Sequence, residues 1–152
     1  MGPVSLLRAA VRAARKDLLT TVALVPEAVR GIAIFEGGRS LPQIFHMILT
    51  LERTFYGHLA RSGFAPSASR FEPAETENDT WEGTWSILHT THAALIGALD
   101  TLDPTAYAAG IGDDGGEETV YLWARGCLLH DRLYAAHIRA VLELDWPERL
   151  LR

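Results

Sequence analysis

The stretch from Gly126 to Ile138 carries imidazole and phenol side chains at helical spacing. His130, Tyr134 and His137 are separated by four and then three positions, so on a wheel of about 3.6 residues per turn they share one face. The same face carries the apolar or weakly polar residues Val120, Trp123, Cys127, Ile138 and Val141. We therefore expect this face to be buried. Because a buried imidazole without a partner costs about 1–3 kcal/mol, other side chains or a metal ion must satisfy these groups.

Two further histidines lie among apolar residues, His46 and His92. Imidazoles that face one another across a helical bundle, with one coordination position left for water, are a common layout for a catalytic divalent metal. A carboxylate such as Asp131 could orient one of the rings. Alternatives remain at each position, because the wheel places His46 towards the surface, and His130 could instead be a core imidazole bonded to Tyr134 or His92.

Other reactive side chains have plainer alternatives. Glu52 lies on an apolar stripe, where a carboxylate could be a metal ligand or a general base, or an edge residue that pairs with Arg53. Cys127 lies one turn before His130, but a cysteine in the middle of a buried helix face is usually an inert apolar residue. His58 and His89 lie on the flanks of their predicted helices, where we expect solvent contact.

Four amphipathic segments must position these residues. Apolar residues recur at three- and four-residue steps in the ranges 5–24, 41–61, 79–102 and 117–144, which predicts four helices. Ser40 followed by Gln43 has the spacing of a capping box at the start of the second helix. In the first helix, the charged residues are expected mostly on the face opposite the apolar one.

The connections between these segments complete the predicted architecture. Range 26–39 is rich in glycine and is expected to carry a short turn of helix, whereas range 62–79 contains Pro66 and Pro73 and is too long for a tight hairpin. No segment shows the alternation of a half-buried strand. We predict an all-α protein, a four-helix bundle in a single domain over residues 1–152, with a long crossover between helices two and three.

The fourth predicted helix has a second apolar stripe, made of Leu122, Leu129, Leu133, Ala140 and Leu144. A helix that is apolar on two faces has two neighbours. The second neighbour is either the other adjacent helix of the bundle or a second copy of the chain, since twofold dimers are the commonest assemblies.

Composition narrows the classes of function. The 152 residues carry a net charge of −5 and are 48% hydrophobic, which allows a full core but disfavours nucleic-acid binding, because that usually needs a basic face. The single cysteine, Cys127, fits a reducing compartment and excludes a cysteine-rich zinc site. The sequence shows neither a signal peptide nor an apolar run long enough to cross a bilayer. We expect a cytoplasmic protein that does not bind membranes.

Helix order, chain length and two motifs resemble the DinB-like superfamily of bacterial four-helix proteins, also named after its YfiT members. The motifs are Gln-Ile-Phe-His46-Met-Ile-Leu in helix two and His130-Asp-Arg followed by Ala-Ala-His-Ile in helix four. The resemblance implies a divalent metal, often nickel or zinc, held by one histidine of helix two and two histidines of helix four. The first two correspond to His46 and His130, and the third falls on Tyr134.

That substitution separates two hypotheses about function. The resemblance implies a metal-dependent hydrolase or thiol transferase of unknown substrate, linked to low-molecular-weight thiols and stress responses. A tyrosine with an ordinary pKa of about 10 is a poor ligand for zinc or nickel, although His92 or His137 could supply a replacement nitrogen. The alternative is a non-catalytic homodimeric bundle that has lost its metal. In it His130, Tyr134 and His137 form either a hydrogen-bonded network in the core or a pocket for a small molecule.

Overall fold

The computed structural model describes residues 2–67, 81–113 and 117–144. Its long helices are α1 (Pro3–Ala23), α2 (Leu41–Arg61), α3 (Trp81–Thr101) and α4 (Val120–Leu142). Three short 3₁₀ helices, η1 (Glu27–Val29), η2 (Glu36–Gly38) and η5 (Pro104–Ala108), lie in the connections. The described residues form no strand. The prediction of four helices without strands is therefore confirmed.

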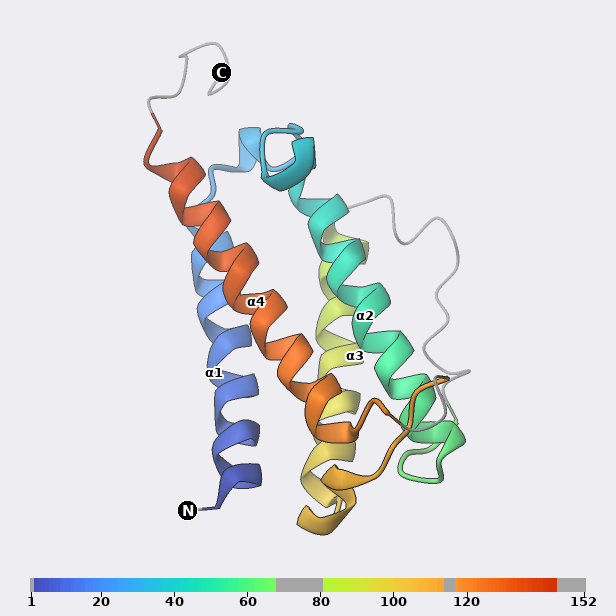
Figure 1. Cartoon of the computed structure of the whole chain (residues 1–152). Coiled ribbons are helices and arrows are strands. Elements are labelled where there is room, and N and C mark those ends of the chain that lie inside the picture. Colours follow the sequence, from blue (N-terminus) through green and yellow to red (C-terminus); the bar gives the residue numbers. More distant parts are fainter. Residues whose placement is uncertain (1, 68–80, 114–116, 145–152) are drawn as a thin grey trace.

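The helices pack as two parallel pairs. α1 lies beside α4 and α2 lies beside α3, and the members of each pair run in the same direction (Figure 1). A parallel α2–α3 pair is what a long crossover between these helices requires. Residues 68–80, which make up most of the predicted crossover, lie outside the described residues.

Local sequence signals explain where the helices begin. The Ser40 side chain accepts a hydrogen bond from the Gln43 backbone, and the Gln43 side chain accepts one from the Ser40 backbone N–H at 2.8 Å. The predicted capping box is therefore confirmed. α4 begins later than predicted, because Thr119 is its N-cap and accepts a hydrogen bond from the Leu122 backbone. The expected cap at Asp79 lies outside the described residues.

The core consists of two apolar clusters stacked along the bundle. One contains Val11, Phe55, Leu95 and Cys127, and the other contains Leu18, Ile48, Leu88 and Tyr134, with further members in each. Each of the four long helices contributes to both clusters. The apolar core is therefore divided at one level of the bundle, and polar side chains fill that level.

No described helix is long and apolar enough to cross a membrane.

Candidate functional site

The polar level of the bundle contains one ionisable residue from each helix: Arg15 of α1, Glu52 of α2, His92 of α3 and Asp131 of α4. We call these residues the polar layer. In each helix, the residue one turn before the polar-layer residue belongs to one apolar cluster, and the residue one turn after it belongs to the other. Their convergence follows from the helix packing, since these positions lie on the inward faces at the same height.

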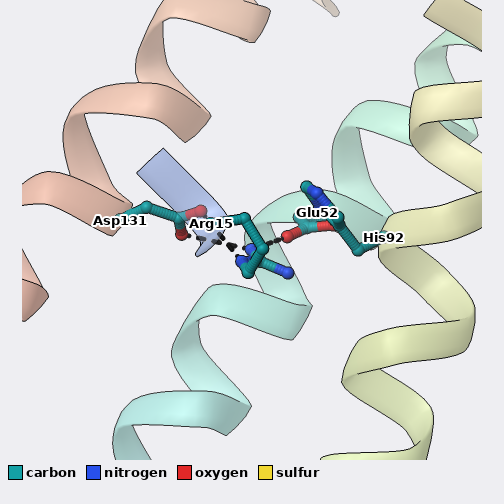
Figure 2. Close-up of polar contacts among 4 residues, drawn as sticks. All are labelled: Arg15, Glu52, His92 and Asp131. Carbon is teal, nitrogen blue, oxygen red and sulfur yellow. Dashed lines mark hydrogen bonds and ion pairs between the residues drawn. The ribbon is translucent and has the colours of Figure 1, made fainter. Parts of the chain in front are cut away.

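Arg15 is the centre of the polar layer. Its Nε donates to Asp131 Oδ2 at 2.9 Å and its Nη2 donates to Asp131 Oδ1 at 3.1 Å. The same Nη2 also donates to Glu52 Oε1. His92 Nδ1 lies 3.3 Å from Glu52 Oε2. Figure 2 shows the guanidinium between Asp131 on one side and Glu52 with His92 on the other.

Arg15, Glu52 and Asp131 are buried and His92 is half-buried, and the charges of the layer shift the pKa values of the three buried groups. Burial by itself would raise the pKa of Glu52, but the charge of Arg15 and the hydrogen bond with His92 outweigh it, so the pKa lies below its ordinary value. For Asp131 the effect of burial is larger than that of Arg15. Burial and the charge of Glu52 therefore raise the pKa of Asp131, although the contact with Arg15 lowers it. Burial by itself would lower the pKa of Arg15, but the charges of Glu52 and Asp131 and their hydrogen bonds raise it above its ordinary value.

Cys127 lies one turn before Asp131 and is buried. Burial raises the pKa of its thiol well above the ordinary value, and the negative charges of Glu52 and Asp131 raise it further. A thiol in this environment stays protonated at neutral pH, so it is a poor nucleophile. The interpretation of Cys127 as an inert apolar residue fits this environment.

The buried face of α4 differs in part from the predicted one. Val120, Cys127, Tyr134 and Ile138 are buried as expected, but His130 is exposed, and His137, Trp123 and Val141 are only half-buried. Compared with the predicted face, the buried face of α4 is turned about the helix axis towards Asp131, whose carboxylate points inward to Arg15. The expectation that His130 and His137 lie in the core is therefore wrong.

The structure disperses the predicted metal ligands over separate surfaces. His46 is exposed and lines a hollow with Arg39, Gln43 and Met47, whereas His130 lines a different hollow with Leu51 and Trp123. His92 is engaged by Glu52 in the polar layer. Tyr134 is buried, with its hydroxyl 3.9 Å from Met47 Sδ.

A metal site needs three or more donors around one point. Among the described residues, no group of three or more histidine, cysteine, aspartate or glutamate side chains is placed to hold a metal ion. The rings of His130 and Tyr134 lie 6.0 Å apart at their centroids, but His46 and His92 do not join them. A nickel or zinc ion at His46, His130, Tyr134, His137 or His92 stays a prediction.

The structure corrects the expectation for His58 and narrows the alternatives for the second apolar stripe of α4. His58 was expected at the surface, but it is buried, with Nδ1 2.6 Å from Arg61 Nη2 and its ring 5.0 Å from that of Trp123. His89 is exposed, as expected. The second apolar stripe of α4 was assigned either to an adjacent helix or to a dimer; Leu129 keeps 50% of its surface exposed and Leu133 keeps 47%, so no described helix of the same chain covers it.

Sequence reasoning missed the role of Arg15 and its ion pairs with Glu52 and Asp131. A signal was present, because each polar-layer residue occupies the second place of an otherwise apolar run with steps of four, three and four. The four runs are Val11-Arg15-Leu18-Val22, Ile48-Glu52-Phe55-Leu59, Leu88-His92-Leu95-Leu99 and Cys127-Asp131-Tyr134-Ile138. The same pattern in four helices, with one cation and two anions, indicates a shared buried layer.

No family model, curated protein or solved structure matches this chain.

Proposed function

We propose that the chain is a DinB-like helical bundle that acts as a homodimeric small-molecule binding protein, and that metal-dependent hydrolysis or thiol transfer has been lost from it. The family assignment depends on the motifs around His46 and His130 and on the arrangement of four helices with α2 parallel to α3. The substitution at Tyr134 supports the loss of the metal.

The observation that carries the proposal is the closure of the polar layer. A catalytic acid or base must reach a substrate within hydrogen-bond distance, but the oxygens of Glu52 are used by Arg15 and His92, and both oxygens of Asp131 are used by Arg15. The guanidinium also supplies the positive charge that two buried carboxylates need. The layer therefore has a structural role, and it fixes how the four helices align.

The homodimer is supported by the exposed stripe of α4. Leu122, Gly126, Leu129, Leu133, Ala136 and Ala140 follow steps of four and three along the helix, which is the spacing of a helix-pairing seam. In an antiparallel pair of α4 helices Leu122 meets Ala140 of the second copy, Gly126 meets Ala136 and Leu129 meets Leu133. Large side chains thus oppose small ones at the ends of the seam.

The size of this seam suits a second copy. α4 has 23 residues and rises about 1.5 Å per residue, so it is about 34 Å long. Two such faces with their flanks bury on the order of 1,000 Å² in total, near the lower limit for a specific protein interface. We therefore assign the exposed leucines of α4 to contact with a second copy.

Metal binding tests the loss of catalysis. Protein purified without a histidine tag is dialysed against zinc or nickel, and the bound metal is measured by mass spectrometry. Because the donors are dispersed, we expect no stoichiometric metal in the wild type. One equivalent of either metal would overturn the proposal. Its loss in His46→Ala and His130→Ala, but not in the control His89→Ala, would then locate the metal at the predicted ligands.

A further inference from the structure

A groove lies between α1 and α3, beside Arg15 and His92 of the polar layer. Its volume is about 390 Å³, and it is lined by Arg12, Arg15, Lys16, Leu19, Thr20, His92, Ala93 and Ile96. At one end α3 is tied to α1 by the ion pair of Arg12 with Asp100. Ligand sites of small molecules begin at about 300 Å³, so the groove is large enough for a small organic molecule.

The side chains that line the groove include cations but no carboxylate. The chain carries a net charge of −5, yet the groove is lined by three cationic side chains and by no acidic one. The described residues include no acidic partner of Lys16 within ion-pair distance. Grooves lined by one sign of charge raise the local concentration of oppositely charged ligands.

The remaining lining of the groove is apolar. Leu19, Ala93 and Ile96 provide aliphatic surface beside the cations, and the Thr20 hydroxyl can donate a hydrogen bond. His92 lines the groove while one ring nitrogen contacts Glu52. A ligand that suits all of these groups has an anionic head and a short apolar body.

We propose that the α1–α3 groove binds a small organic acid, with its carboxylate at Lys16 and its apolar part against Leu19, Ala93 and Ile96. This inference rests on the proposed binding function and names its site and its class of ligand. The charge of Arg12 is compensated by Asp100, and that of Arg15 by Glu52 and Asp131. Lys16 is the cation that is available for a direct contact.

Titration calorimetry with octanoate on the full chain, in the oligomeric state that it adopts in solution, tests the proposal. Octylammonium, which has the same alkyl chain and the opposite charge, is the control probe. Lys16→Glu reverses a charge at the groove, whereas Arg132→Glu makes the same change on the exposed surface of α4. We expect octanoate to bind in the millimolar range or tighter, about tenfold more weakly to Lys16→Glu, and within about twofold of wild type to Arg132→Glu.

The outcomes separate this inference from the proposed function. Absence of octanoate binding, equal binding of octylammonium, or equal affinities of wild type and Lys16→Glu would overturn the groove assignment. Ala93→Phe, which fills the groove without changing charge, must also weaken binding, and unchanged affinity in this variant would be a second contradiction. Stoichiometric zinc or nickel would overturn the proposed loss of catalysis and leave the octanoate result standing.

Discussion

The guanidinium of Arg15 in α1 donates two hydrogen bonds to the carboxylate of Asp131 in α4, at 2.9 Å and 3.1 Å. This pair (Figure 2) joins α1 and α4, which run in the same direction (Figure 1). A bidentate contact fixes the distance between the helices and their rotation, because the planar guanidinium matches the carboxylate in one orientation. Apolar side chains above and below the pair do not impose such a constraint.

The polar layer also resists a shift of any one helix along its axis. A shift by one turn would leave a buried charge without its partner, which costs about 3–5 kcal/mol. The surrounding clusters of leucine, isoleucine and phenylalanine would tolerate such a shift more easily. The layer therefore specifies the alignment of the four helices while the apolar clusters supply most of the stability.

Two carboxyls of the polar layer should make opposite contributions to the stability of the fold at acidic pH. The pKa of Asp131 is raised above its ordinary value of 3.8, so the folded state binds its proton more tightly and gains stability as the pH falls through that raised pKa. The pKa of Glu52 is lowered below its ordinary value of 4.5, so its contribution to stability is lost as the pH falls from 4.5 through that lowered pKa. The two contributions therefore change with pH in opposite directions.

Urea unfolding between about pH 3 and pH 6 measures this dependence. Asp131→Asn should remove the gain in stability on acidification, and Glu52→Gln should weaken the loss. The difference between wild type and each variant cancels the titration of other carboxyls. Identical pH profiles of the wild type and both variants would show that the polar layer does not titrate in this way.

The homodimer assignment predicts a specific effect of Leu129→Glu. The wild type should have twice the 16.7 kDa mass of the chain when it is measured by size-exclusion chromatography with light scattering. A carboxylate at the centre of the seam cannot be desolvated against a second copy, so the variant should be monomeric. Leu24→Glu changes an exposed leucine outside α4 and should remain dimeric. A wild type of single-chain mass would contradict the assignment.

The helices were predictable because their signals are local. The apolar steps of α2 and its capping box at Ser40 and Gln43 predicted Leu41–Arg61, and these are its bounds in the structure. Such signals depend only on the residues within one turn. The α2–α3 crossover was recognisable in the same way, from the prolines and the length of the segment between the two helices.

The polar layer was harder to predict because it depends on partners that are distant in sequence. Arg15 reads as a solvent-facing residue in α1, since a charge is rarely buried unless it is paired. Its partners Glu52 and Asp131 are 37 and 116 positions away, and nothing in one helix shows the others. The prediction that His130 and His137 lie in the core failed for the same reason, because the wheel of α4 alone does not show that Asp131 faces inward; only the repeated pattern in all four helices indicates it.

The central claim, that the buried charges are committed to one another, is tested most directly by a double-mutant cycle of Arg15→Met and Asp131→Asn. Urea unfolding gives the free energy of unfolding of the wild type, both single variants and the double variant, with the exposed Arg125→Met as a control that should change it by less than about 0.5 kcal/mol. Arg15→Met alone should cost about 3–5 kcal/mol, because it leaves two buried carboxylates without a cation. The account predicts a coupling of about 1–3 kcal/mol between the two positions. A coupling below about 0.5 kcal/mol, with Arg15→Met no more costly than Arg125→Met, would contradict it.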